Sequence, residues 1–99
     1  MATLYVTEYG TIAGLPATAN GQVPLEPPLA DYIVAIPGIS PPFQPTTRMV
    51  RLNCDAVCSV LFGQAPSAST TNGRFAANQT EFRGVPEGMG FRVSVVANV

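Results

Sequence analysis

The stretch TTRMVRLNCDAVCSVLFG, residues 46–63, carries the clearest strand pattern in the chain. Apolar side chains occupy alternate positions, and polar side chains such as Arg51 and Asn53 stand between them. This period of two is typical of a β-strand with one face in a core and the other toward water or a partner. The pattern breaks near Asp55, which predicts either a pair of strands or one long bent strand. The positions predicted to face the core are Val50, Leu52, Cys54, Cys58, Val60 and Phe62.

The same rhythm continues on both sides of this stretch. In residues 2–9, Leu4 and Val6 share one face, and the residues between them share the other. Short strands are also predicted at 74–77, 80–85 and 90–97, with a polar loop at 64–73 and a turn at 86–88. No segment has a helical stripe of useful length. The chain therefore predicts an all-β fold, an antiparallel β-sandwich or jelly-roll-like barrel in a single domain over residues 1–99.

Residues 16–45 differ from the rest because they hold eight of the ten prolines. Proline has no backbone N–H, so a run of central strands is excluded here. We expect an extended N-terminal arm with one short strand at 31–36, placed before the main sheet region at 46–99. The arm also carries many large apolar side chains, unlike a disordered linker. It is predicted to lie along a partner, and the alternative is that it packs across its own sheet.

The composition narrows the classes of partner. Charged residues make up 11% of the chain, against about 25% in ordinary domains, and the net charge is −1. Nucleic-acid binding needs a basic stripe, which is missing. No apolar run is long enough to span a membrane, and the N-terminus does not have the pattern of a signal peptide. The low charge suggests a surface covered by partners or by other copies of the chain, and the alternative is an ordinary polar surface.

Familiar catalytic arrangements are not found in the sequence. There is no histidine or lysine, so imidazole-dependent and lysine-dependent catalysis are excluded. Two of the acids Asp55, Glu81 and Glu87 could form a carboxylate pair, although each lies beside a predicted turn or on a solvent face. Cys54 and Cys58 do not have the partners of a zinc site and are predicted to be buried thiols. We therefore predict no catalytic residue, no metal and no cofactor.

Three stretches of the chain resemble a known group of proteins. They are TRMVRLNCDAVCSVLFGQAPSA at 47–68, RFAANQTEFRGVPEG at 74–88 and FRVSVV at 91–96, together with the opening MATLYVTEYG at 1–10. In these stretches the chain is similar to small tailed-bacteriophage proteins encoded among virion structural genes. The resemblance implies a small β-sandwich carried on a phage particle, as a head decoration or cement protein. A head-completion, tail or fibre-associated role stays open.

The resulting hypothesis is a non-enzymatic capsid decoration protein on the surface of the phage head, assembled in the host cytoplasm. Its expected partners are the major capsid protein and its own copies, in a homo-oligomer such as a trimer, with no nucleic acid and no membrane. The alternatives are a receptor- or glycan-binding module of a tail or fibre, and a small glycosidase that uses two acids. Arginines are expected to pair with capsid carboxylates. The candidate interface residues are Leu25, Pro27, Pro28, Leu29, Tyr32, Phe43, Arg48, Arg51 and Arg92.

Overall fold

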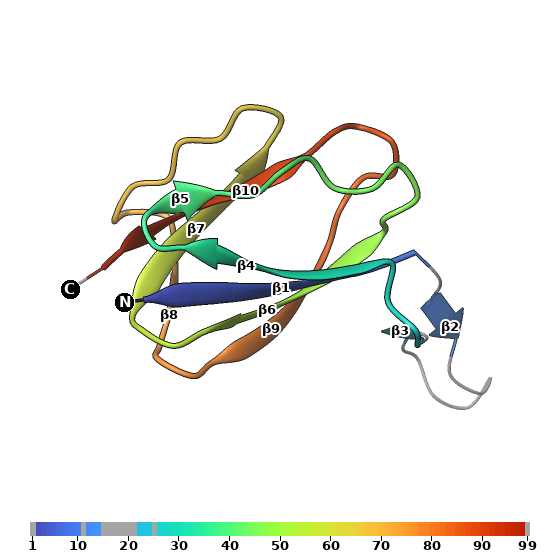
Figure 1. Ribbon diagram of the computed structural model, residues 1–99, viewed down its shortest axis with the longest axis horizontal. Helices are drawn as coiled ribbons and strands as arrows, with labels where there is room; N and C mark the ends of the chain where they lie inside the picture. The colour runs from blue at the N-terminus through green and yellow to red at the C-terminus, as the bar shows by residue number, and fades with distance from the viewer. Residues whose placement is uncertain (1, 11, 15–21, 25, 99) are drawn as a thin grey trace.

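The computed structural model describes residues 2–10, 12–14, 22–24 and 26–98, and every regular element within them is a β-strand (Figure 1). The all-β prediction is therefore confirmed. The strands are β1 (Thr3–Tyr9), β2 (Ile12–Gly14), β3 (Gln22–Pro24), β4 (Ala30–Ala35), β5 (Gly38–Ile39), β6 (Met49–Cys54), β7 (Cys58–Gly63), β8 (Gly73–Phe75), β9 (Thr80–Gly84) and β10 (Arg92–Ala97).

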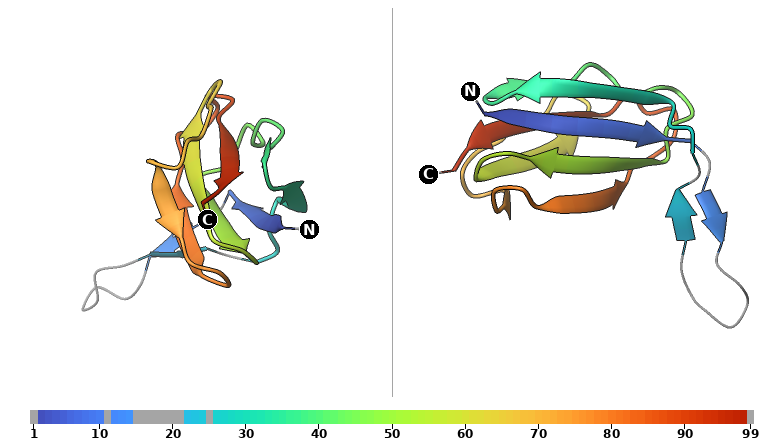
Figure 2. Two further views of the ribbon diagram at one scale, coloured as in Figure 1. Left: turned by 90° about the vertical axis from the view of Figure 1, so that its left-hand side faces the viewer. Right: turned by 60° about the horizontal axis from the view of Figure 1, so that its bottom comes forward.

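Two four-stranded antiparallel sheets pack face to face to form a sandwich (Figure 2). The first sheet has the order β4-β1-β6-β9, and the second has the order β5-β10-β7-β8. The stretch at 46–63 forms two strands with a break at the expected place. However, β6 and β7 belong to opposite sheets and are not hydrogen-bonded to each other. The chain crosses from one sheet to the other between Cys54 and Cys58.

The core lies between the sheets and contains the predicted apolar faces. On β1, Leu4 and Val6 point inward while Tyr5 is exposed, as the alternation predicts. Burying an aliphatic or phenyl side chain of this size is worth about 1.5–3 kcal/mol, so the facing rows hold the layers together. The buried cluster is Leu4, Val6, Val34, Ile36, Phe43, Val50, Leu52, Cys54, Cys58, Val60, Phe75, Val93 and Val95.

The proline-rich segment corrects one expectation. Residues 30–45 are not an arm free to lie on a partner, because β4 pairs with β1 and β5 pairs with β10. The segment passes from the first sheet to the second, and Ile36 and Phe43 contribute to the core. The alternative, packing across its own sheets, is correct here. The prolines fit because they stand outside β4 and β5, where no ladder needs their missing N–H.

The strands β2 and β3 form a separate two-stranded antiparallel ladder, with Ala13 opposite Val23. The ladder extends away from the sandwich beyond the ends of β1 and β4 (Figure 2). β1 and β4 are themselves antiparallel neighbours, and Glu8 lies opposite Ala30. The β2–β3 ladder is therefore an insertion in a β1–β4 hairpin. Of the first part of the expected arm, residues 16–21 and Leu25 lie outside the described residues.

The outer faces of the two sheets are treated differently by the rest of the chain. The loop at 64–72 folds against the outer side of the second sheet, where the backbone N–H of Ala68 donates to Ser94 Oγ at 3.0 Å. Asn98 Nδ2 donates both to Ser59 Oγ at 2.7 Å and to the carbonyl oxygen of Thr70 at 3.2 Å. Ser59 is fully buried as a result. The predicted polar loop thus covers a face of its own sheet.

The edge strand β9 reverses the usual arrangement of apolar and charged residues. Glu81 and Arg83 lie opposite Leu52 and Val50, on the inner side, while Phe82 is 50% exposed on the outer side. Arg83 donates from Nε and Nη2 to Glu81 Oε1 at 3.0 and 2.8 Å, and its guanidinium carbon stands 5.5 Å from the centre of the Phe75 ring. Charges turned inward at an edge discourage strand addition by another chain.

Candidate functional site

The outer face of the first sheet is formed by two rows of side chains that cross its strands. One row places Tyr5 between Ile33 on β4 and Asn53 on β6. The next row places Thr7 between Asp31 and Arg51. The alternation in β1 and β6 sends all of these side chains away from the core, because their chain neighbours Leu4, Val6, Leu52 and Cys54 are the buried ones.

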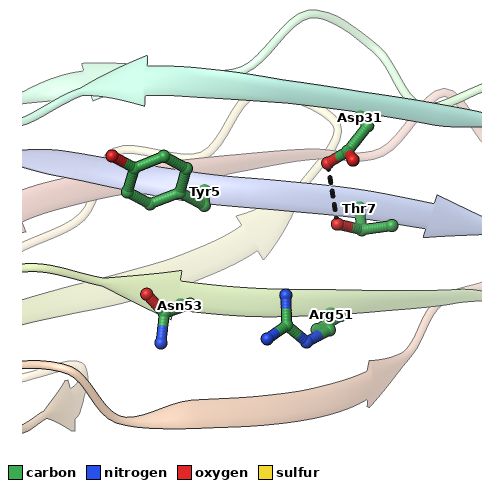
Figure 3. Close-up of a pocket in the computed structure, with 5 residues that line it drawn as sticks. All are labelled: Tyr5, Thr7, Asp31, Arg51 and Asn53. Atoms are coloured by element: carbon green, nitrogen blue, oxygen red, sulfur yellow. Dashed lines mark hydrogen bonds between the residues drawn. The ribbon is translucent and has the colours of Figure 1, made fainter.

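Between these two rows lies a shallow hollow of about 390 Å³ that is open to solvent and is lined by Tyr5, Thr7, Asp31, Arg51 and Asn53 (Figure 3). Thr7 has the shortest side chain of the lining residues and is nearly buried, so it lies at the floor between longer neighbours. The Thr7 hydroxyl donates to Asp31 Oδ1 at 2.9 Å. Asp31 therefore keeps its second carboxylate oxygen for another donor.

The amide of Asn53 is oriented by the edge strand. Its Nδ2 donates to Thr80 Oγ1 at 2.8 Å and to the carbonyl oxygens of Gln79 and Asn78 at 3.3 and 3.4 Å. These bonds hold the nitrogen toward β9 and turn the carbonyl oxygen toward Tyr5 (Figure 3). The Arg51 guanidinium makes no hydrogen bond or ion pair with the residues that the structure describes. The hollow thus offers a guanidinium, a carboxylate oxygen and an amide oxygen beside a half-exposed aromatic ring.

The three arginines of the predicted interface lie in separate places. Arg51 lines the hollow. Arg48 precedes β6 and approaches Glu87, with 3.8 Å between Nε and Oε1 and both side chains more than half exposed. Arg92 lies on the second sheet, opposite Gly63. Pairing of all three arginines with partner carboxylates would therefore need contacts at separate parts of the surface.

The apolar candidates also separate. Pro27 and Leu29 are exposed just before β4, and Pro28 is half-buried between them. Phe43 is buried in the core, 6.1 Å from Phe62 between ring centres, so it is not part of the surface. Tyr32 packs inward against the same core. The sequence did not separate Tyr32 from Phe43, because Tyr32 lies in an unbroken apolar run and Phe43 lies outside any strand.

Glu8 is a buried acid that the sequence analysis did not single out. Only 2% of its surface is exposed, and it points inward from β1. Its Oε1 accepts from the backbone N–H of Gln44 at 2.8 Å and from Thr47 Oγ1 at 2.6 Å. Burial, followed by the nearby Glu8 carboxylate, raises the pKa of Tyr32. Glu8 therefore ties the crossing segment between the sheets to β1, which is a structural role.

Tyr9 lies beside the hollow, at the end of β1, and its side chain is almost fully buried. Its hydroxyl donates to Glu26 Oε2 at 2.7 Å. This hydrogen bond, followed by burial, raises the pKa of Tyr9. The contact fixes the start of the 26–29 segment against the strand that carries Tyr5 and Thr7.

Both cysteines are buried and free, as predicted. Cys54 Sγ lies 3.4 Å from the carbonyl oxygen of Ala76. Burial, then the neighbouring Cys54, raises the pKa of Cys58 to about 12. The Cys58 thiol therefore stays protonated near neutral pH, and both buried side chains pack as small apolar groups.

The acids considered for a glycosidase are held by separate partners. Asp55 Oδ1 accepts from the backbone N–H of Thr3 at 2.7 Å, at one end of β6. Glu87 lies near Arg48, at the other end of that strand. Glu81 binds Arg83 and Gln79 on β9. Asp55 and Glu87 therefore do not form a pair across one substrate.

Within the described ranges, no three His, Cys, Asp or Glu residues are grouped so that they could hold a metal ion. In the same ranges there is no helix of the length and hydropathy required to cross a membrane. Comparison with protein-family models, with curated proteins and with solved structures finds no match for this chain. The site must therefore be interpreted from its own residues.

Proposed function

We propose that this chain is a non-enzymatic structural protein of a phage particle, a decoration protein that binds the major capsid protein on the head surface. The likeness of residues 1–10, 47–68, 74–88 and 91–96 to small phage virion proteins supports the proposal. The sandwich supplies a stable body, and the β2–β3 ladder supplies the docking element. In this proposal the ladder replaces the longer arm expected at 16–45.

The observation that carries the proposal is the position of the ladder. β1 and β4 already pair directly, so their hairpin does not need the 15 residues at 11–25 to close. A two-stranded ladder without a second layer is marginally stable alone. A partner surface would stabilise it by pairing with an edge or covering a face. In its described residues the insertion forms no strand ladder with the sandwich. An element that is free of that pairing and gains stability from a partner is suited to docking.

The test is to remove the insertion and measure attachment. A variant in which residues 11–25 are replaced by a short Gly-Asn turn keeps the β1–β4 pairing and is expected to unfold at a similar denaturant concentration. Phage heads stripped of this protein should bind the full chain and lose most of that binding with the variant. Stripped heads should also resist heat less well than heads with the full chain restored.

A matched control is Arg74→Ala, an exposed change on β8, in the sheet that does not carry the insertion. It should attach as the full chain does. If the shortened variant folds and still binds heads with full affinity, the ladder is not the docking element. If the full chain binds no part of the head, the decoration role is wrong.

We also propose that copies of the chain associate with each other on the particle, as the low charge and the resemblance suggest. A homo-oligomer such as a trimer is the expected form. Light scattering of the purified chain should give a mass that is a small multiple of 10.4 kDa. A single mass of 10.4 kDa at all concentrations up to those of the assembled particle would contradict this part of the proposal.

The second candidate function is a receptor- or glycan-binding module of a tail or fibre. One observation favours it, namely the polar hollow beside Tyr5 on the open face of the first sheet. The residues that line the hollow come from β1, β4 and β6, and none comes from the loops at 64–73 and 86–90.

A further inference from the structure

We propose that the hollow on the outer face of the β4-β1-β6-β9 sheet is a saccharide-binding site that holds one pyranose unit of a glycan. The proposal is independent of the docking role of the β2–β3 ladder. It rests on the hydrogen-bonding and aromatic side chains that surround Thr7, and on the exposure of the sheet face around them.

The charges in the hollow argue against an ionic ligand. Arg51 would attract an anion, but Asp31 stands directly across Thr7 from it and would repel the same anion. A cation would be attracted by Asp31 and repelled by Arg51. A neutral ligand that both donates and accepts hydrogen bonds suits a guanidinium and a carboxylate placed on either side of one residue.

The hydrogen-bonding groups match a polyol. Asp31 has one oxygen left to accept from a hydroxyl, and Asn53 turns its carbonyl oxygen toward the hollow while its nitrogen is held by β9. Arg51 presents N–H donors that no described residue engages. Neighbouring hydroxyls of a sugar ring can donate to the first two groups and accept from the third. Hydrogen bonds to charged groups of this kind are the stronger ones.

The shape and the aromatic ring complete the match. Tyr5 is 46% exposed and stands at one end of the hollow, where its ring can cover the apolar C–H face of a sugar. The volume of about 390 Å³ lies within the range of small-ligand pockets, about 300–1,000 Å³. Ile33, which is 65% exposed opposite Tyr5, and Phe82, opposite Arg51, can contact the rest of a longer glycan.

The lining is also pre-organised. The Thr7–Asp31 bond and the three contacts of the Asn53 amide fix two of the polar groups before any ligand arrives. The backbone positions belong to paired strands, so their spacing is set by the sheet. Rigid groups lose less conformational entropy on binding, which favours even a small ligand.

The experiment uses the full chain labelled with ¹⁵N and four probes: the methyl glycosides of glucose, galactose, mannose and N-acetylglucosamine. At least one probe should shift backbone amide signals that are confined to the hollow, at Thr7, Asp31, Arg51 and Asn53. A glycan array with the fluorescent chain then extends the test to oligosaccharides that contain the same unit.

Two variants probe the site without removing a core residue. Asp31→Asn keeps the size and still accepts from Thr7, but it loses the charge, and Tyr5→Ala removes the ring. Each should weaken binding at least tenfold, which corresponds to about 1.4 kcal/mol. Arg74→Ala, an exposed arginine on β8 of the other sheet, is the matched control and should bind as the full chain does.

Three results would overturn the proposal. The first is that no probe or array glycan binds. The second is that a glycan binds but Asp31→Asn and Tyr5→Ala bind equally well, which would place the ligand elsewhere. The third is that these variants lose attachment to phage heads while no glycan binds, which would make the hollow a contact for protein. Loss of glycan binding with normal attachment to heads separates this proposal from the docking role.

Discussion

The outer faces of the two sheets differ more than any other pair of regions in the molecule. On the second sheet, the loop at 64–72 and Asn98 cover Ser59 and bind Ser94. Ile39 and Leu61 stay exposed on the uncovered part of that sheet. On the first sheet, Tyr5, Ile33 and Phe82 are exposed around a polar hollow. Each sheet buries its inner face in the same core. The chain therefore covers part of one outer face with its own loop and leaves the hollow on the other face uncovered.

The largest expected effect distinguishes the covered face from the open one. Ser59→Arg places a charge between the second sheet and its loop, where the serine is fully buried. The uncompensated charge and the displaced loop should lower the free energy of unfolding by about 3 kcal/mol or more. Ala35→Arg, an exposed position on β4 of the first sheet, should change it by less than about 0.5 kcal/mol.

Urea unfolding followed by circular dichroism measures both variants under one condition. Similar small losses for the two substitutions would mean that the loop does not cover the second sheet in solution. The contrast between the covered face of the second sheet and the open face of the first would then be wrong. The hydrogen bonds of Asn98 to Ser59 and Thr70 would have to be weak.

The second effect concerns two acids on opposite sides of the first sheet. Glu8→Ala removes the buried acceptor for Gln44 and Thr47 and leaves both donors unsatisfied. An unsatisfied buried donor costs about 1–3 kcal/mol, so a loss in or above that range is expected. Asp31→Ala removes one partly exposed bond to Thr7 on the outer face and should cost about 1 kcal/mol or less.

Hydrogen exchange locates these losses. Glu8→Ala should speed exchange of the Gln44 amide well before the amides of β7, because the crossing segment is released first. Uniform exchange across both sheets, with no early release at Gln44, would contradict the assignment of Glu8 as the tie between β1 and that segment.

The sequence predicted the fold well because the signals for the fold are local. The alternation at 46–63 and at 2–9 identified which residues of β1, β6 and β7 face the core. It also identified Arg51 and Asn53 as outward residues. Alternation depends only on the chain neighbours of a residue, so no knowledge of pairing was required.

The candidate site was not predictable in the same way. The hollow exists because Thr7 lies opposite Arg51 on one side and Asp31 on the other. These partners are separated from Thr7 by tens of residues, and the register that joins them is set by the whole sandwich. The inward turn of Phe43 and of Tyr32 was missed for a related reason. Tyr32 lies in β4, where the run of apolar residues 32–35 does not mark which side faces inward. Phe43 lies outside any strand, in the segment that crosses between the sheets, where the two-residue period does not apply.

The smallest effect on the free energy of unfolding at neutral pH is expected from the ionisation of Cys58. This residue lies on the inner side of the second sheet. Burial favours its neutral, protonated form, so its pKa in the folded protein is about 12, above the ordinary value of 9.0. Well below pH 9 the Cys58 thiol is protonated in both the folded and the unfolded chain, so the stabilisation from burying this thiol is fully present there. As the pH rises from 9 toward 12 the unfolded chain loses the proton first, so stability falls.

Tyr9 and Tyr32, whose pKa values are also raised, contribute to stability loss at high pH, so a variant is needed to isolate the thiol. Cys58→Ala should show a shallower fall in the free energy of unfolding between pH 8 and pH 10.5 than the full chain. Native Cys58 should react with iodoacetamide at pH 8 far more slowly than the urea-unfolded chain, because the thiolate is the reacting form. Rapid labelling of the folded chain at that pH would show that the inner side of the second sheet is open to solvent. The second sheet would then be exposed to solvent on its inner side as well, and the contrast between its covered outer face and the open face of the first sheet would not hold.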